Sequence, residues 1–124
     1  MLKKILLVDD SATQRLASRM LFDNRKERYQ FISASDGKEG VEVALKELPD
    51  LIFMDIEMPR LGGLDACRLL KENEATRTIP IILLTMRDDE ADIEQGYACG
   101  CSDFLVKPLN EQKVSATLKS HFGE

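Results

Sequence analysis

The fold is decided by KILLVDD, residues 4–10, and DLIFMD, residues 50–55. Each stretch contains an unbroken run of four apolar residues that ends in an acidic residue. A strand that is apolar at every position is typical of a parallel sheet whose two faces are both covered. These stretches therefore predict two buried strands that carry carboxylates at their carboxyl ends.

Further along the chain, short apolar runs alternate with longer amphipathic stretches. We expect strands at Lys4–Val8, Phe31–Ala34, Asp50–Met54, Ile79–Leu84 and Asp103–Val106. We expect helices at Ser11–Phe22, Lys38–Leu48, Leu64–Asn73, Asp89–Ala98 and from Asn110 or Glu111 to Phe122. Such alternation indicates an α/β fold, with a parallel sheet and helices on both of its faces.

The apolar positions of these helices recur at helical spacing. They are Leu16, Ala17, Met20 and Leu21 in the first helix, Val41, Ala44, Leu45 and Leu48 in the second, Leu64, Cys67, Leu69 and Leu70 in the third, and Val114, Leu118 and Phe122 in the last. In the third helix we expect Leu64, Cys67, Leu70 and Leu69 to face inward.

Composition limits the class of protein. The chain has 124 residues and a net charge of −5, with 44% hydrophobic and 31% charged residues, which is typical of one folded domain. The acidic balance argues against binding to nucleic acid or to an anionic membrane surface. The apolar run after Lys4 is too short for a signal peptide, and the run from Ile79 to Met86 is too short to span a bilayer. We therefore expect a cytoplasmic protein without membrane insertion, and three cysteines fit a reducing compartment.

The carboxyl ends of the expected strands carry the polar residues of a possible site. They are Asp9, Asp10, Asp55, Thr85 and Lys107. Ligands of open parallel sheets bind at this edge. Three adjacent carboxylates need a cation, and an all-oxygen ligand set favours Mg²⁺. An anion shared by this metal and Lys107 would be held well, and phosphate is the obvious one.

Taken together, these motifs resemble those of the receiver domains of response regulators in two-component signalling. The resemblance rests on Asp9-Asp10, the stretch DIEMPRLGG at residues 55–63, Thr85 and Lys107-Pro108. It covers essentially the whole chain, so residues 1–124 are expected to form one receiver domain. It implies a doubly wound (βα)5 flavodoxin-like fold with a sheet of order 2-1-3-4-5, and a cis peptide bond before Pro108.

The resemblance also implies a metal site. Asp55 matches the phosphoacceptor, Asp10 matches a direct Mg²⁺ ligand, and Asp9 matches its partner, which often acts through water. Glu57 matches the position whose backbone carbonyl completes the site. Mg²⁺ is therefore the expected cofactor.

The remaining positions imply a switch. Lys107 matches the lysine that pairs with the phosphoryl group, Thr85 the switch hydroxyl, and Phe104 the aromatic residue that moves with it. The implied donor is a sensor histidine kinase or a histidine phosphotransfer protein. The implied output is binding of a downstream protein by the fourth helix, fifth strand and fifth helix. Such a protein is a phosphoacceptor without classical enzymatic turnover.

Several alternatives stay open. The site also fits a Mg²⁺-dependent phosphohydrolase with an aspartyl nucleophile, or an interaction domain that is never phosphorylated. The acidic group Asp88, Asp89, Glu90, Asp92 and Glu94 is interpreted as a helix N-terminus, with a partner surface as the alternative. Cys99-Gly-Cys101 is interpreted as packing near the fifth strand, with a redox or metal role as the alternative. The chain is either a complete single-domain regulator or part of a longer protein.

Overall fold

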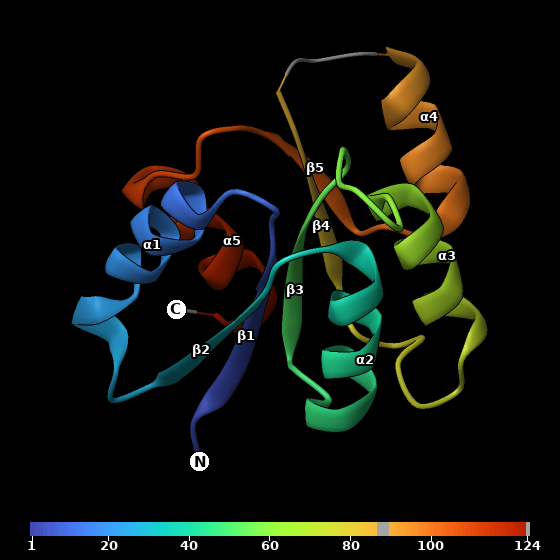
Figure 1. Ribbon diagram of the computed structural model, residues 1–124. Helices are drawn as coiled ribbons and strands as arrows, with labels where there is room; N and C mark the ends of the chain where they lie inside the picture. Colours follow the sequence, from blue (N-terminus) through green and yellow to red (C-terminus); the bar gives the residue numbers. More distant parts are fainter. Residues whose placement is uncertain (87–89, 124) are drawn as a thin grey trace.

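A computed structural model describes residues 1–86 and 90–123. Strands and helices alternate along the chain, as Figure 1 shows. The strands are β1 (Lys3–Val8), β2 (Tyr29–Ala34), β3 (Leu51–Asp55), β4 (Ile81–Thr85) and β5 (Asp103–Val106). The helices are α1 (Ala12–Leu21), α2 (Gly37–Glu47), α3 (Gly63–Glu72), α4 (Glu90–Cys99) and α5 (Glu111–Phe122), with a short 3₁₀ helix η1 (Asp23–Arg25) after α1.

The strands of the described residues form one sheet in the order β2-β1-β3-β4-β5, and each neighbouring pair is parallel. The expected order is therefore confirmed. Helices α1 and α5 lie on one side of the sheet, and α2, α3 and α4 lie on the other (Figure 1). The fold is doubly wound, as the alternation of strands and helices predicted.

Each central strand contributes to two cores, because successive side chains of a strand point to opposite faces. Ile5 and Leu7 of β1 pack in the cluster beneath α1 and α5, with Val114 and Leu118 of α5. Leu6 and Val8 pack in the cluster beneath the other three helices. This two-sided burial explains the uninterrupted apolar character of the strands.

Side chains cap several helices at their N-termini. The Ser11 hydroxyl accepts from the Gln14 N–H at 3.2 Å, and the Asp36 carboxylate accepts from the Glu39 N–H at 2.8 Å. Asn110 caps α5 through the N–H of Lys113 at 2.8 Å. Each such cap is worth ~1 kcal/mol, and each fixes where the chain turns from a strand end into the next helix.

The apolar residues at helical spacing in the first helix do not all belong to its buried face. Leu16 is 60% exposed and Met20 is 62% exposed, whereas Ser18 is buried. The inward stripe of α1 runs through Gln14, Ser18 and Leu21, at the spacing of four and three residues that places side chains on one helix face. Apolar periodicity misleads here because a second stripe with the same period lies on the solvent side.

Other leucines of the expected helix faces are also exposed. Leu69 was expected to face inward but is exposed, as are Leu45 and Leu48 of the second helix. Most buried positions of these helices are small: Gly40 and Ala44 in α2, and Ala66 and Cys67 in α3. Leu70 of α3 is fully buried, as expected.

Helix α3 begins against the backbone of β3, and only glycine permits this approach. A Cβ atom on Gly63 would stand 2.1 Å from the carbonyl oxygen of Asp55 and 2.9 Å from the Cα of Ile56. The Gly63 N–H also donates to the Ile56 carbonyl at 2.8 Å. The start of α3 therefore fixes the chain directly after Asp55.

Gly63→Ala should lower the free energy of unfolding by ~1–3 kcal/mol, because the added methyl group overlaps backbone atoms that have no rotamer to change. Urea denaturation measures the loss. The neighbouring Gly62→Ala is the control, since its Cβ would meet a single carbonyl oxygen at 3.2 Å. We expect a smaller loss there, and equal losses at the two positions would contradict the close approach at Gly63.

Candidate functional site

The centre of the site is an ammonium group held between two buried carboxylates. Nζ of Lys107 lies 3.1 Å from Oδ2 of Asp9 and 3.0 Å from Oδ2 of Asp55. Asp9 is 1% exposed and Asp55 is 5% exposed, at the ends of β1 and β3. Lys107 directly follows β5, so three strands deliver their charged residues to one edge of the sheet.

Asp10 adds a third carboxylate. Oxygen atoms of Asp9, Asp10 and Asp55 all lie within 4.8 Å of one another. Asp10 is exposed, so this side of the cluster is open to solvent. The structure thus brings together the four charged residues that the sequence placed at strand ends.

The other two predicted site residues are Thr85 and Glu57, at or just beyond the ends of β4 and β3. Thr85 is buried at the end of β4, and its carbonyl accepts a 2.7 Å hydrogen bond from the backbone N–H of Lys107. This bond aligns the chain after β5 with the end of β4. Glu57 is exposed, two residues beyond Asp55, and its backbone N–H bonds the Asp55 carboxylate.

Burial and charge compete in setting the protonation of this cluster. Burial raises the pKa of Asp55 above its ordinary value, and the hydrogen bond and charge of Lys107 oppose this without cancelling it. Burial by itself lowers the pKa of Lys107, but hydrogen bonds and charges from Asp55 and Asp9 outweigh it, so the pKa of Lys107 is raised. The ammonium therefore stays charged and supports the ionised carboxylates.

The charge balance of the cluster favours a divalent cation. With every group ionised, three carboxylates and one ammonium give a net charge of −2. Carboxylate oxygens are hard ligands, and a small set of them with an open side suits Mg²⁺, which keeps several of its waters. The donor set of Asp9, Asp10 and Asp55 therefore fits this ion.

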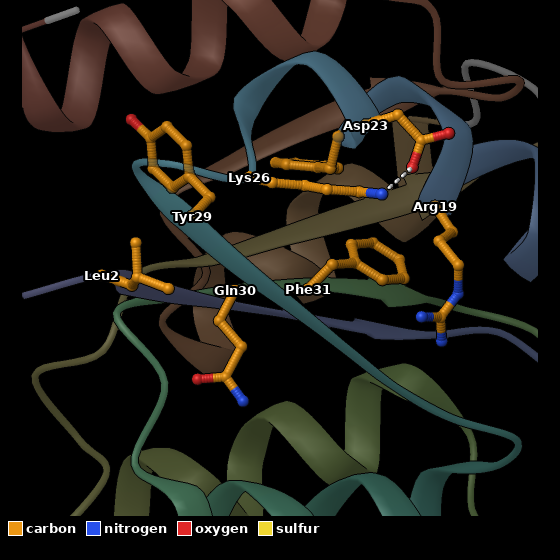
Figure 2. Close-up of a pocket in the computed structure, with 8 residues that line it drawn as sticks. Leu2, Arg19, Asp23, Lys26, Tyr29, Gln30 and Phe31 are labelled. Carbon is orange, nitrogen blue, oxygen red and sulfur yellow. Dashed lines mark ion pairs between the residues drawn. The ribbon is translucent and has the colours of Figure 1, made fainter.

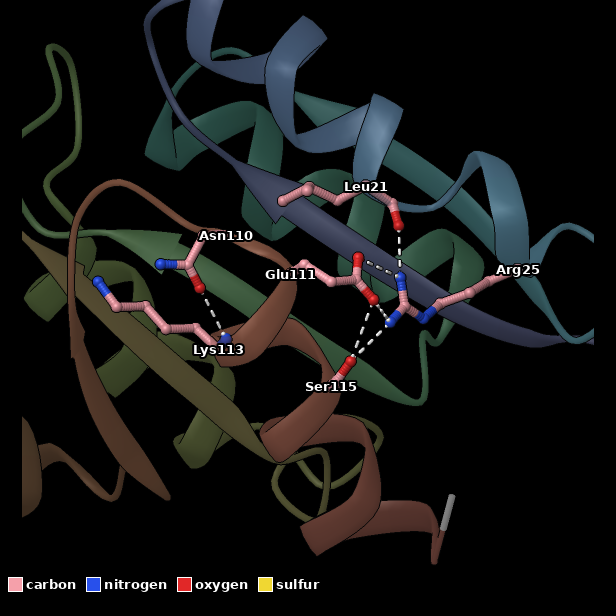
Figure 3. Close-up of polar contacts among 6 residues, drawn as sticks. All are labelled: Leu21, Arg25, Asn110, Glu111, Lys113 and Ser115. Carbon is pink, nitrogen blue, oxygen red and sulfur yellow. Dashed lines mark hydrogen bonds and ion pairs between the residues drawn. The ribbon is translucent and has the colours of Figure 1, made fainter.

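The Lys107–Pro108 peptide bond is cis. The first turn of α5, which follows it, is held by Arg25. Arg25 of η1 forms an ion pair with Glu111 in the first turn of α5 and donates to the Ser115 hydroxyl at 2.8 Å (Figure 3). Arg25 also donates to the Leu21 carbonyl at 2.6 Å. Arg25 thus connects the start of α5 to the end of α1.

Sequence reasoning missed two arginines that support the site. Arg15 of α1 donates to the backbone carbonyl of Asp9 at 2.8 Å. Arg60 forms an ion pair with the α2 cap Asp36, with Nε and Oδ2 3.1 Å apart, although its φ of 67° is uncommon for a non-glycine residue. The apolar pattern of the sequence does not show these contacts, because Arg15 binds a backbone carbonyl and Arg60 binds a residue 24 positions away.

The acidic group after β4 falls partly outside the structural description. Asp88 and Asp89 lie beyond the described residues, and Glu90 begins α4. Asp92 follows Glu90 in the first turn of that helix, a position where the helix dipole favours acidic side chains.

A separate cavity of about 310 Å³ lies away from this cluster (Figure 2). Residues of α1, η1 and β2 line it, with aromatic side chains from Phe22, Tyr29 and Phe31. None of the three clustered carboxylates takes part in its wall. The chemistry of the charged cluster is therefore independent of this cavity.

The structure is a doubly wound domain with a lysine and three carboxylates clustered at the carboxyl edge of its sheet. A model of the response regulator receiver domain matches residues 5–119. The chain therefore belongs to this family, and it is a receiver domain of two-component signalling.

Known proteins similar to the chain differ in length. Protein PilH of Pseudomonas aeruginosa is 37% identical over 117 residues, which cover 94% of this chain and 95% of PilH. Response regulator PleD of Caulobacter vibrioides is 39% identical over 118 residues, which cover 94% of this chain and 25% of PleD. The chain thus spans about a quarter of the length of PleD.

Among solved structures, the chain is similar to the receiver domain of sensor histidine kinase PA1611 from Pseudomonas aeruginosa PAO1. The TM-score is 0.88, with 28% identity and full coverage of both chains. That structure has a magnesium ion coordinated in its active-site cleft.

Of the helices described for the present chain, none is long and apolar enough to cross a membrane.

Asp55→Asn should stabilise the fold at neutral pH. Folding raises the pKa of Asp55 above the unfolded value of about 3.9, so ionised Asp55 is less favourable in the folded than in the unfolded chain. The gain should shrink as the pH falls through the raised folded pKa, and vanish below the unfolded pKa. Urea denaturation without Mg²⁺ at several pH values measures it.

Glu42→Gln on the exposed side of α2 is the control for this experiment. It removes a carboxyl group that is not in the cluster, so we expect little change at any pH. A gain for Asp55→Asn that is independent of pH, or a loss at neutral pH, would contradict the assigned cost of ionised Asp55.

Proposed function

We propose that this receiver accepts a phosphoryl group on Asp55 in a Mg²⁺-dependent reaction and thereby changes its partner-binding surface. The observation that carries the proposal is the ammonium of Lys107, 3.0 Å from Asp55 and 3.1 Å from Asp9, beside the third carboxylate of Asp10. No other set of at least three potential metal ligands among the described residues is so close together.

A carboxylate held in this way is suited to nucleophilic attack on phosphorus. An oxygen of Asp55 forms the new bond, the bond from phosphorus to the donor's imidazole nitrogen breaks, and that nitrogen takes the electron pair. The ammonium of Lys107 lies where the incoming phosphoryl oxygens gather charge, so it stabilises them. Burial of Asp55 excludes much of the water around the nucleophile.

Within this proposal, Asp9, Asp10, Asp55 and the backbone carbonyl of Glu57 hold Mg²⁺. The bound ion supplies positive charge to the transferring phosphoryl group. Asp9 and Asp55 are already bound by Lys107, while exposed Asp10 contributes the ligand nearest to solvent. The Mg²⁺ in the similar receiver of PA1611 supports this assignment.

The output is proposed to begin at Thr85 and Phe104. A phosphoryl group adds about −1.5 to −2 charges, and the Thr85 hydroxyl is its expected hydrogen-bond donor. The Phe104 ring contacts that of Tyr97 on α4, with centroids 5.9 Å apart. Gly96 lies against the same ring, because a Cβ there would be 2.2 Å from it. Movement of the Phe104 ring would therefore change its packing against α4 directly.

The proposed docking face for the downstream protein is formed by α4, β5 and α5. Its exposed apolar residues include Tyr97 of α4 and Val106 of β5.

The proposed phosphoryl donor is a sensor histidine kinase or a histidine phosphotransfer protein. No direct contact with nucleic acid is part of the proposal. We further propose that residues 1–124 form one receiver domain, that it acts in the cytoplasm, and that it is a phosphoacceptor without classical turnover.

Incubation with Mg²⁺ and a small phosphodonor such as acetyl phosphate should add one phosphoryl group, visible in the intact mass. Asp55→Ala should abolish the addition, because the nucleophile is removed, and chelation of Mg²⁺ should suppress it. Asp65→Ala, at an exposed aspartate of α3, should be labelled like the wild type.

Labelling that persists in Asp55→Ala would overturn the choice of phosphoacceptor.

Asp10→Asn tests the metal site separately from the nucleophile, since it leaves Asp55 and Lys107 in place. We expect it to need much more Mg²⁺ for the same rate. An unchanged Mg²⁺ dependence would contradict the proposed ligand role of Asp10.

A further inference from the structure

Three thiols gather where α3 meets the end of α4. Cys67 belongs to α3, Cys99 is the last residue of α4, and Cys101 lies just before β5. The Sγ of Cys67 is 3.9 Å from the carbonyl oxygen of Cys99. Cys67 and Cys101 are buried in one core cluster, and Cys99 packs against that cluster while remaining partly exposed. None of these thiols belongs to the carboxylate site.

The surroundings of the three thiols differ. Nη2 of Arg68 lies 3.7 Å from the Sγ of Cys99, and the charge of Cys99 is the largest cause of a raised pKa at Arg68. Burial raises the pKa of Cys67 to about 12 and that of Cys101 to about 11, and the charge of Cys99 contributes to both shifts. The two buried thiols therefore stay protonated, while Cys99 is reached by both solvent and a guanidinium group.

We propose that Cys99 is a peroxide-reactive thiol and that Cys67 resolves its oxidised form, which gives a disulfide between α4 and α3. A reactive cysteine combines access to the oxidant with a nearby positive charge, and Cys99 has both. A resolving cysteine needs protection and an approach to the reactive residue. Cys67 is buried, and its Sγ lies 3.9 Å from the backbone carbonyl oxygen of Cys99. This inference concerns a second site and is independent of phosphorylation at Asp55.

The oxidant is a hydroperoxide. The Cys99 thiolate attacks the outer peroxide oxygen, the O–O bond breaks, and the leaving oxygen takes a proton, so that Cys99 becomes a sulfenic acid. The Cys67 sulfur then attacks the Cys99 sulfur, loses its proton, and expels the hydroxyl group as water. Two thiols are oxidised to one disulfide by two electrons, and one hydrogen peroxide is reduced to two waters.

Cys67 is a better resolving residue than Cys101. Cys99 and Cys101 are separated only by Gly100, whose φ is +98°, and Cys101 is held by a hydrogen bond from its N–H to the Gly96 carbonyl at 3.1 Å. A disulfide across one residue would close a small ring in this fixed turn. Cys67, by contrast, approaches Cys99 from another helix.

A thiolate metal site is less favoured by the same geometry. Among the described residues, the only group of three or more potential metal ligands that lies within 4.8 Å is the carboxylate cluster. The three sulfurs would therefore have to move together before a soft metal ion could bind.

The proposed cross-link would hold the C-terminal end of α4 to α3. Helix α4 carries Gly96 and Tyr97, which contact the ring of Phe104. A disulfide at Cys99 would therefore restrict the helix on which the α4–β5–α5 face depends. Peroxide would thereby act on the same surface as phosphorylation.

The test is treatment of the whole chain with hydrogen peroxide, followed by intact-mass measurement and non-reducing peptide mapping. We expect the loss of two hydrogen atoms, a linked pair of peptides that contain Cys67 and Cys99, and reversal by dithiothreitol. Cys99→Ser should abolish the loss, and Cys101→Ser should retain it. A link from Cys99 to Cys101, or unchanged disulfide formation in Cys99→Ser, would overturn the proposal.

Two further variants separate the assigned roles. In Cys67→Ala the sulfenic acid of Cys99 should persist and react with dimedone, and absence of the adduct would overturn Cys99 as the reactive thiol. Arg68→Gln should slow alkylation of Cys99 by iodoacetamide several-fold, while Arg77→Gln, on the exposed loop after α3, should not. Equal rates in both variants would overturn the role of the guanidinium.

Discussion

The whole site depends on one buried ammonium group. Lys107 bridges Asp9 and Asp55, so a positive charge separates two carboxylates that would otherwise repel each other inside the protein. Their attraction to Lys107 offsets part of the free-energy cost of moving charged groups from water into the protein interior. Because the offset is incomplete, the pKa of Asp55 remains raised. The free chain therefore carries an unfavourable charge that a cation at the open side, next to Asp10, would relieve.

The scaffold holds this arrangement through backbone contacts more than through side chains. Parallel strands bring Asp9, Asp55 and Lys107 to one edge, and the bond from Lys107 N–H to the Thr85 carbonyl aligns the last two strands. Gly63 lets α3 start against the carbonyl of Asp55. The loop between β3 and α3 is held to α2 by the ion pair of Arg60 with Asp36. Changes far from the carboxylates can therefore alter their positions, which makes the site sensitive to the packing of its helices.

The sequence was sufficient to predict a parallel sheet and the residues at the strand ends, because an apolar run followed by a charged residue is a local signal. The order of the strands was not readable from these runs and came only from the resemblance to receiver domains. The face that each helix buries was harder to predict. Leu16 and Met20 are exposed and Ser18 is buried, because inward orientation depends on which stripe meets the sheet. Arg15 and Arg60 were missed for a related reason: each contact depends on how a helix or loop folds back, onto the Asp9 carbonyl for Arg15 and onto Asp36 for Arg60. The proximity of Cys67 to Cys99 likewise needed the packing of α3 on α4.

The ammonium of Lys107 lowers the pKa of Asp55 against the effect of burial. The most direct measurement is a carboxyl-carbon NMR titration of Asp55 in the wild type and in Lys107→Met, without Mg²⁺. We expect a wild-type pKa above the ordinary aspartate value and a higher one in the variant, because the opposing effect of Lys107 is lost while burial remains. The same pKa in both proteins would contradict it.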